Sequence, residues 1–323
     1  MPKISAEARV SRRLRFRDLQ VFLTVVECGS MGKAAAQLGT TQPSVSELIS
    51  GLESTIGARL FDRNAQGVEP TLYGQALSKR AIAAFDELKQ GLRDLEFLAN
   101  PTIGEIRIGC PDSVAATILP TMITDFCRDF PGIALRFDQV PTPTLEVPGL
   151  HARKLDMVIA WLSVPKDQYG DNLNVEILLE DEVVVAAGRN SHWARRRKIG
   201  LSDIADGPWT GAPPETMARI VLDNAFRAAS LPGPKSEVTT FSVPLRQHLL
   251  TLGGFLTAMP KSLLHGTSGL KALPIVLPPH NYPIAIVTVK NRTLSPVVEL
   301  FLERLRQFRK SPDMTRPKDR ARR

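Results

Sequence analysis

Three short segments with the pattern of helices, separated by tight breaks, lie between residues 16 and 52 and restrict the possible folds most strongly. Gly29 and Gly39 end the first two segments, because glycine readily adopts the left-handed conformation that closes a helix. Ser30 and Thr41 precede the second and third segments, where their side chains can cap a helix. Because the breaks between them are so tight, the second and third helices must cross at a steep angle, which predicts a helix-turn-helix.

The residues after the third helix have the pattern of a small β-hairpin. The stretch RLFDRNAQGVEPT contains two extended pieces around a turn at Gln66 and Gly67. The third helix exposes short hydrogen-bonding side chains, among them Gln42 and Ser44, which suit base edges and phosphates. The three helices and the hairpin together predict a winged helix-turn-helix over residues 14–71.

A long helix is predicted next, over about 72–98. Its apolar residues step by four, three, four and three positions: Ala81, Phe85, Leu88, Leu92 and Leu95. This stripe suits the seam of a coiled coil between two chains. A helix packed on its own domain would carry a similar stripe. Of the two interpretations we favour a dimerisation helix.

Residues from about 102 to 308 alternate strand-like and helix-like segments, which predicts open, mostly parallel α/β sheets. Strands are expected in GEIRIGC, IALRFDQV, LDMVIAWL, EDEVVVAAG, TLGGFLTAMP and YPIAIVTVK. A helix is expected in SVAATILPTMITDFCRDF, bent or broken at Pro120, and an amphipathic helix in VVELFLERLRQF.

The basic charge of the chain lies at its two ends. The net charge is +8, of which residues 1–17 carry +5 and residues 309–323 carry +5, so the part between them carries −2. Basic ends favour polyanions without giving sequence specificity. For the C-terminal tail, a disordered solubilising end is an equally good interpretation.

Several classes of protein are disfavoured by what the sequence lacks. It has no run of eighteen apolar residues and no apolar segment near its start, so we expect no membrane span, no secretory signal and a cytoplasmic location. Dinucleotide, P-loop, zinc-protease and serine-hydrolase motifs are missing, so we expect no catalytic residue, no metal and no cofactor. The three cysteines, Cys28, Cys110 and Cys127, are expected to fill the core, with a redox switch through the last two as the alternative.

The N-terminal segment also carries a dense set of signature residues. They are Phe22, Gly29, Ser30, Ala34, Ala35, Leu38, Gln42 to Ser46, Ile49, Leu52, Glu53, Gly57, Leu60, Phe61, Arg63, Thr71 and Gly74. This pattern closely resembles the LysR family of bacterial transcription regulators. Weaker similarities extend along the chain, at GEIRIG, Leu119-Pro120, Phe126, Phe130-Pro131, Leu155-Asp156, Val158-Ile159 and Ala258 to Pro260.

The resemblance implies a ligand-controlled transcription regulator with a winged helix-turn-helix, a linker helix and a two-lobed, Rossmann-like effector domain similar to periplasmic binding proteins. The expected parts are a basic arm (1–13), the DNA-binding domain (14–71), the linker (72–100), the effector domain (101–308) and a basic tail (309–323). Lobe 1 is expected at about 101–168 and 269–308, and lobe 2 at about 169–268. Expected partners are double-stranded DNA, a small effector, a second copy in a dimer or tetramer, and RNA polymerase. An enzyme with a DNA-binding appendage is the less favoured alternative.

In this fold, DNA is expected to meet the second and third helices and the hairpin. The candidates are Ser30, Met31, Lys33, Thr40, Thr41, Gln42, Pro43, Ser44, Ser46, Glu47, Ser50 and Arg63. Family members often carry Arg or Lys where this chain has Glu47 and Ser50. Attraction to phosphates is therefore expected to depend more on Arg63, on the N-terminus of the helix and on residues 1–17.

Effector contacts are expected near strand ends, where open α/β sheets bind ligands. The candidates are Asp112, Ser113, Trp161, Ser163, Thr210, Thr240, Phe241 and Ser242. The start of a helix at Asp112 and the hydroxyl groups suit an anionic metabolite or a polyol. Asp112 itself would oppose an anion unless its side chain pointed away.

Overall fold

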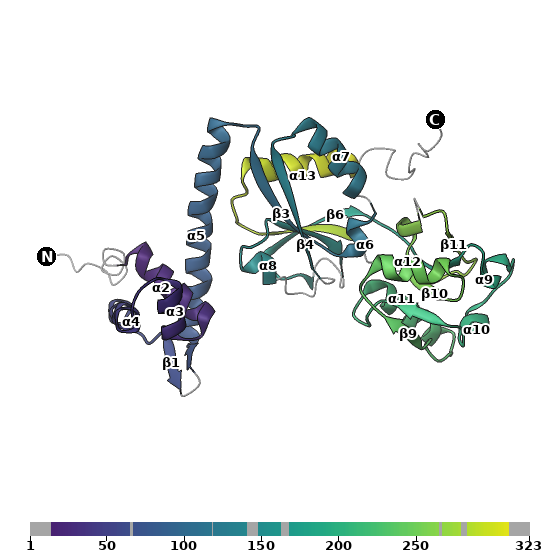
Figure 1. Ribbon diagram of the computed structural model, residues 1–323, viewed down its shortest axis with the longest axis horizontal. Coiled ribbons are helices and arrows are strands. Elements are labelled where there is room, and N and C mark those ends of the chain that lie inside the picture. The colour runs from purple at the N-terminus through teal and green to yellow at the C-terminus, as the bar shows by residue number, and fades with distance from the viewer. Residues whose placement is uncertain are drawn as a thin grey trace. The chain divides into compact units, whose positions relative to one another are not determined.

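The computed structural model describes residues 14–64, 67–117, 119–140, 148–162, 168–264, 267–278 and 283–309. Contacts divide the chain into two units, residues 1–90 and 91–323 (Figure 1). The predicted basic arm 1–13, the turn residue Gln66, the candidate Ser163 and residues 310–323 of the predicted tail lie outside the described residues.

The first unit begins with the three short helices that the sequence predicts. They are α2 (Phe16–Cys28), α3 (Met31–Gln37) and α4 (Gln42–Ile56). Gly29 ends α2 in the left-handed conformation, with φ of 60°. The N–H of Lys33 donates to the Ser30 hydroxyl at 3.5 Å, and the N–H of Ser44 donates to the Thr41 hydroxyl at 3.4 Å. Both predicted caps therefore form, and they place α4 with its N-terminal turn exposed.

A two-stranded antiparallel hairpin follows, made of β1 (Phe61–Asn64) and β2 (Gly67–Pro70). The Glu53 carboxylate on α4 accepts hydrogen bonds from the N–H groups of Leu60 and Phe61, at 2.7 and 3.3 Å. Gly74 lies so close to the Leu60 carbonyl that a Cβ atom would stand 2.2 Å from its oxygen. The hairpin is therefore fixed to both the helix before it and the helix after it.

The long helix α5 (Leu72–Ala99) uses its predicted apolar stripe in two ways. Ala81 is 2% exposed, and the ring of Phe85 packs edge-on against Phe16 with centroids 5.4 Å apart. Leu88, Leu92 and Leu95, by contrast, are 53 to 63% exposed. The first two residues of the stripe thus pack within the first unit, whereas the side chains of the last three are exposed among the described residues.

The second unit contains two five-stranded sheets. The first has the order β4-β3-β5-β12-β6. Its strands are β3 (Gly104–Cys110), β4 (Ile133–Gln139), β5 (Met157–Trp161), β6 (Leu173–Leu179) and β12 (Ile284–Val289). Its helices are α6 (Asp112–Ala115), α7 (Leu119–Asp129), α8 (Pro148–His151) and α13 (Pro296–Arg309). α7 and α13 pack together on one face, with the rings of Phe126 and Phe301 5.0 Å apart (Figure 1).

The second sheet has the order β11-β7-β10-β8-β9. Its strands are β7 (Val183–Gly188), β8 (Trp209–Gly211), β9 (Ser236–Thr239), β10 (Leu256–Pro260) and β11 (Leu270–Ala272). Its helices are α9 (His192–Arg195), α10 (Leu201–Ile204), α11 (Met217–Ala228), α12 (Val243–Thr251) and the 3₁₀ turn η2 (Lys261–Leu264). We refer to the parts built on the first and second sheets as lobe 1 and lobe 2.

Three sequence-based expectations need correction here. The sheets are mixed rather than mostly parallel, because β12 runs antiparallel to both β5 and β6, and β7 runs antiparallel to both β10 and β11. The chain enters lobe 2 only after β6 and leaves it only after β11, so the expected lobe boundaries at 168 and 269 fall too early. The strand expected in TLGGFLTAMP is shorter than predicted: α12 extends to Thr251, and the strand β10 begins only at Leu256.

The expected helix is broken just before Pro120, because α6 ends at Ala115 and α7 begins at Leu119, which puts Pro120 in the first turn of α7. None of the helices in the described ranges has the length and apolarity needed to cross a membrane.

Candidate functional site

The outer face of α4 and the hairpin form the first candidate surface. Thr40, Thr41, Gln42, Glu47 and Ser50 are exposed, and Arg63 is exposed on β1. Ser30 and Thr41 act as helix caps, and the Ser50 hydroxyl donates to the Ser46 carbonyl at 2.8 Å. These contacts hold the polar side chains on one side of a short, well-anchored helix.

Met31 and Lys33 on α3 differ in their surroundings. Lys33 is exposed, whereas Met31 is 7% exposed and packs in the core of the unit. A contact between Met31 and DNA would need its side chain to leave that core, so its position favours a packing role.

Two arginines near the start of α2 line a groove beside α4. Arg15 and Arg17 share this groove of about 460 Å³ with Ser44 and Glu47. They lie at the end of the basic segment 1–17, and they bring positive charge to a helix that carries little of its own. This placement agrees with the expectation that residues 1–17 supply part of the attraction to phosphates.

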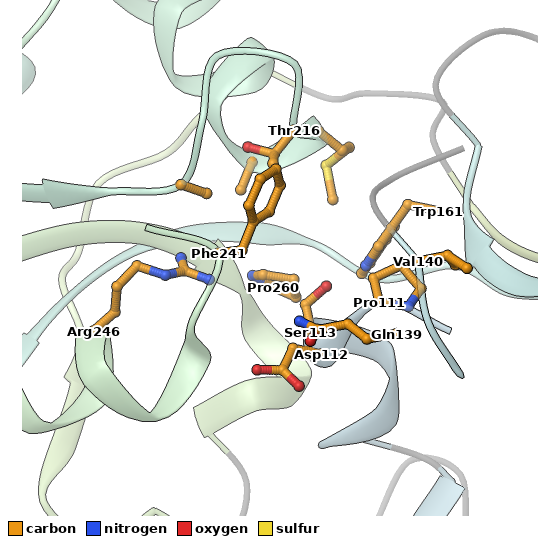
Figure 2. Close-up of a pocket in the computed structure, with 13 residues that line it drawn as sticks. Pro111, Asp112, Ser113, Gln139, Val140, Trp161, Thr216, Phe241, Arg246 and Pro260 are labelled. Carbon is orange, nitrogen blue, oxygen red and sulfur yellow. The ribbon is translucent and has the colours of Figure 1, made fainter. Parts of the chain in front are cut away.

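The second candidate site is a cavity of about 500 Å³ between the two lobes (Figure 2). The wall from lobe 1 consists of Pro111, Asp112, Ser113, Gln139, Val140 and Trp161. These residues follow or end β3, β4 and β5, which run parallel, so their carboxyl ends meet at one edge of the sheet. Asp112, Ser113 and Trp161 are predicted candidates that the fold brings together here.

The wall from lobe 2 consists of Ala212, Thr216, Met217, Ala218, Phe241, Arg246 and Pro260. Thr216 to Ala218 form the start of α11, and Arg246 lies on α12. Phe241 is the one predicted lobe 2 candidate among the described residues of this wall. Most side chains of the cavity are apolar, so the few polar groups decide what it can bind.

Arg246 is the most unusual of these polar groups. Its side chain is 3% exposed, and its Nε and Nη1 atoms have no hydrogen-bond partner among the described residues. Burial lowers the pKa of Arg246, and the negative charge of Asp112 opposes that shift. An arginine remains protonated even so, because a guanidinium group is not deprotonated in proteins. The cavity therefore contains a buried cation with two free donors.

Sequence reasoning missed Arg246, and the sequence gives little signal for it. Val243, Arg246 and Leu250 are the buried residues of α12 and follow three- and four-residue spacing. The same helix also exposes Leu245, so its apolar residues do not mark one face clearly and do not single out Arg246 as buried.

The other predicted effector candidates serve different purposes. Thr210 is fully buried on β8 and does not line the cavity. The Thr240 hydroxyl accepts a hydrogen bond from the Ser242 N–H at 3.1 Å, and the Ser242 hydroxyl caps α12 by accepting from Leu245 N–H at 3.3 Å. These two hydroxyls stabilise the loop that presents Phe241.

The predicted helix start at Asp112 is also weaker than expected for binding an anion. α6 is only four residues long. So short a helix has few aligned peptide dipoles, because the macrodipole grows from successive turns. The positive charge of the cavity comes from Arg246 instead.

The cysteine alternative meets a physical obstacle at Cys110. This residue is 3% exposed. Burial, followed by the charge of Asp112, raises the pKa of Cys110 to about 12. The thiolate is the reactive form of cysteine, so a redox switch through Cys110 is disfavoured at neutral pH.

Comparison with known proteins agrees with this architecture. Residues 16–75 match the family described as "Bacterial regulatory helix-turn-helix protein, lysR family", and residues 99–310 match "LysR substrate binding domain". YdcI of Escherichia coli, named an uncharacterized HTH-type transcriptional regulator, is 28% identical over 92% of this chain and 96% of its own length. GbpR of Azospirillum brasilense, an HTH-type transcriptional regulator, is 26% identical over 94% of this chain and 91% of its own.

Solved structures give the same result at the level of the fold. The crystal structure of CbnR, a LysR family transcriptional regulator, matches 92% of this chain and its own full length, with a TM-score of 0.62 and 20% identity. Since one family pattern alone covers more than half of the residues, the chain belongs to the LysR family: it is a transcriptional regulator with an N-terminal DNA-binding domain and a C-terminal effector-binding domain.

Proposed function

We propose that the effector of this regulator is a small organic acid, bound in the interlobe cavity with its carboxylate on Arg246. The observation that carries the proposal is the buried guanidinium with two unpaired donors. A buried charge without a partner costs several kcal/mol, so an entering carboxylate would relieve an existing penalty. Arginine is suited to this role because its planar fork can bind a carboxylate through two parallel hydrogen bonds.

The rest of the cavity favours an acid with an apolar body. Val140, Trp161, Met217 and Phe241 contribute apolar and aromatic surface from both lobes. A volume of about 500 Å³ lies within the usual range for small-molecule sites. Of the anion and the polyol expected from the sequence, the anion fits better, because a polyol could accept hydrogen bonds from Arg246 but would supply no counter-charge to it and little apolar surface to the aromatic wall.

Binding at this place also offers a route to regulation. A ligand that contacts both walls stabilises the arrangement of the lobes in which both contacts are made. The difference in effector affinity between two arrangements of the lobes sets the largest change that the effector can cause in the affinity for DNA.

The test is calorimetry with a panel of small aliphatic and aromatic carboxylates on the wild type and on Arg246→Gln. We expect at least one acid to bind, and the variant to lose on the order of tenfold or more in affinity. Arg227→Gln is the matched control, because Arg227 is an exposed arginine on α11 of the same lobe. Equal affinity of wild type and Arg246→Gln for every acid that binds would overturn the proposal.

For DNA, we propose that the exposed residues of α4, with Arg63 and the arginine pair Arg15 and Arg17, contact the operator. The polar face of α4 supports base readout, and the arginines support phosphate contacts. A full-length CbnR has been crystallised with its target DNA, and it matches 92% of this chain with a TM-score of 0.51.

We further propose that Leu88, Leu92 and Leu95 join two copies through α5, because a row of exposed leucines on a helix needs cover.

RNA polymerase is proposed as a further partner, and no catalytic role is proposed, since the relatives are named transcriptional regulators. Because its proposed partner is bacterial operator DNA, we place the protein in the cytoplasm.

A further inference from the structure

The cavity carries a second charge, of opposite sign, on the wall that faces Arg246. Asp112 begins α6, two residues after the end of β3 on lobe 1, while Arg246 projects from α12 of lobe 2 (Figure 2). Among the described residues, no hydrogen bond or ion pair reaches the Asp112 carboxylate. The two groups influence each other electrostatically, yet they form no salt bridge. Among the residues that the structure describes, the cavity thus holds an aspartate and an arginine on opposite walls, neither of which has an ion-pair partner.

This arrangement is a poor match for a simple anion. A carboxylate bound on Arg246 would enter the field of Asp112, which is strong enough to act on both Arg246 and Cys110. A simple cation is no better, because Arg246 would repel it. A ligand with one charge of each sign gains from both groups, since each charge of the ligand meets its opposite.

We propose that the effector is a zwitterion, an α-amino acid with an apolar or aromatic side chain. Its carboxylate binds Arg246, its ammonium group binds Asp112, and its side chain lies against Trp161 and Phe241. This inference rests on the proposed function, because it places the acid group at the same arginine. It adds a second requirement on the ligand, and it assigns Asp112 the role of selecting amino acids over other acids.

The Asp112 carboxylate is well placed for selection. It accepts hydrogen bonds but cannot donate them while ionised, so it complements an ammonium group and rejects a second carboxylate. Ser113, the next residue on the same wall, offers a hydroxyl that can bind either group. A site built around a polar group of its ligand discriminates strongly against analogues that lack the group, because its own buried groups are then left unpaired.

The experiment compares ligands that differ by one charged group. The probes are L-phenylalanine, 3-phenylpropanoate and 2-phenylethylamine, together with L-leucine, 4-methylpentanoate and 3-methylbutylamine. Calorimetric affinities are measured on full-length wild type, Asp112→Asn, Arg246→Gln and the control Asp125→Asn. Asp125 is an exposed carboxylate on α7 of lobe 1, paired with Arg128 at the surface. Thermal denaturation checks that each variant is folded, and Arg246→Lys, which keeps the charge, replaces Arg246→Gln if the latter is not.

For wild type and Asp125→Asn, we expect at least one amino acid to bind about tenfold or more tightly than its des-amino acid and its amine. Asp112→Asn should weaken amino-acid binding by about tenfold and should leave des-amino acids unaffected or tighter. Arg246→Gln should lose both kinds of acid.

The two proposals fail in different ways. If des-amino acids bind wild type as tightly as amino acids, and Arg246→Gln still abolishes binding, the zwitterion is overturned while the organic-acid site stands. If Asp112→Asn weakens both kinds of acid equally, Asp112 acts on the structure of the cavity and does not select the ammonium group. If no acid binds and Arg246→Gln matches wild type, both proposals are overturned.

Discussion

Burial gives Cys110 a chemistry different from that of the other cysteines. Its pKa is raised to about 12, mainly by burial and then by the charge of Asp112. At pH 8 the thiolate should therefore be only about one part in ten thousand of the folded protein. Cys127 is exposed on α7. Iodoacetamide at pH 8 should thus modify Cys127 in the native protein and Cys110 only after unfolding, as measured by mass spectrometry of the peptides.

The same shift predicts a pH dependence of stability. The folded state holds the Cys110 proton more tightly than the unfolded chain, whose reference value is 9.0. The contribution to the free energy of unfolding is therefore complete below pH 9 and declines as the pH rises from 9 toward 12. Equal rates of alkylation of Cys110 and Cys127 in native protein would contradict both expectations and would revive the redox alternative.

Gln42 tests DNA recognition at the same scale. Its side chain is exposed at the N-terminal turn of α4, where an amide can pair with adenine through two hydrogen bonds. Gln42→Ala should weaken operator binding by about 1–3 kcal/mol, and binding to random DNA by less. Ser54→Ala, on the exposed C-terminal half of α4, is the control. Gel-shift titrations on both DNAs measure the difference, and an equal loss on both would show that Gln42 does not read bases.

At the scale of elements, a buried cluster of charged residues connects two strands of lobe 1 with the segment that follows a third strand. Asp156, directly before β5, accepts hydrogen bonds from the Arg107 backbone N–H at 2.9 Å and from the guanidinium groups of Arg107 and Arg292 at 2.9 and 3.0 Å. The Arg292 side chain is fully buried, and its Nη1 donates to the Leu155 carbonyl at 2.7 Å. The cluster thereby joins β3 and β5 to the segment after β12.

Asp156→Ala should destabilise the second unit by about 3–5 kcal/mol, because it leaves a buried guanidinium without its counter-charge. The control is Asp125→Ala, whose partner Arg128 is exposed, and which should cost less than about 1 kcal/mol. Urea denaturation followed by circular dichroism gives both values. Similar costs for the two variants would mean that the Asp156 cluster adds little beyond a surface ion pair.

α5 is the element on which the proposed dimer depends. Leu88→Glu together with Leu92→Glu would put charges into the proposed seam and should give a monomer or a lower oligomer in sedimentation. Lys89→Glu, an exposed position on the same helix outside the stripe, should leave the oligomer unchanged. An unchanged oligomer in the double variant would assign the exposed leucines to another contact.

The sequence predicted elements best where local chemistry decides them. The caps at Ser30 and Thr41 and the break at Pro120 are dictated by residues at the site itself, so they were predictable. A strand was expected over β12 but none over β6, and the antiparallel direction of β12 was not predicted, because strand pairing depends on where the chain crosses between lobes. That crossing is a property of the whole fold and leaves little trace in periodicity.

At the scale of the whole molecule, the cavity combines residues far apart in the chain. Asp112, Trp161 and Phe241 could be predicted because they lie at or just after the ends of strands, where α/β sheets place ligands. Arg246 could not be assigned in the same way, because it lies within a helix and faces the cavity only through the packing of α12. Thr210 was predicted by the same reasoning, but its side chain is fully buried and does not line the cavity. The reasoning therefore identifies the edge of the sheet where a ligand binds, but it does not identify which side chains at that edge reach the ligand.

The contrast between Ser113 and Thr210 gives a test of the whole regulator. Ser113 lines the cavity, whereas Thr210 is fully buried away from it and its hydroxyl has no hydrogen-bond partner among the described residues. Ser113→Ala should raise the effector concentration for half-maximal response about three- to tenfold, the effect of one lost hydrogen bond. Thr210→Val should leave that concentration unchanged, because it removes an unpaired hydroxyl at nearly constant shape.

Reporter output is titrated with the acid that binds best by calorimetry, beside a gel-shift without effector. Both variants should bind operator DNA like wild type, since neither position lies in the first unit. A shifted response in Thr210→Val with a normal response in Ser113→Ala would move the effector site away from the cavity.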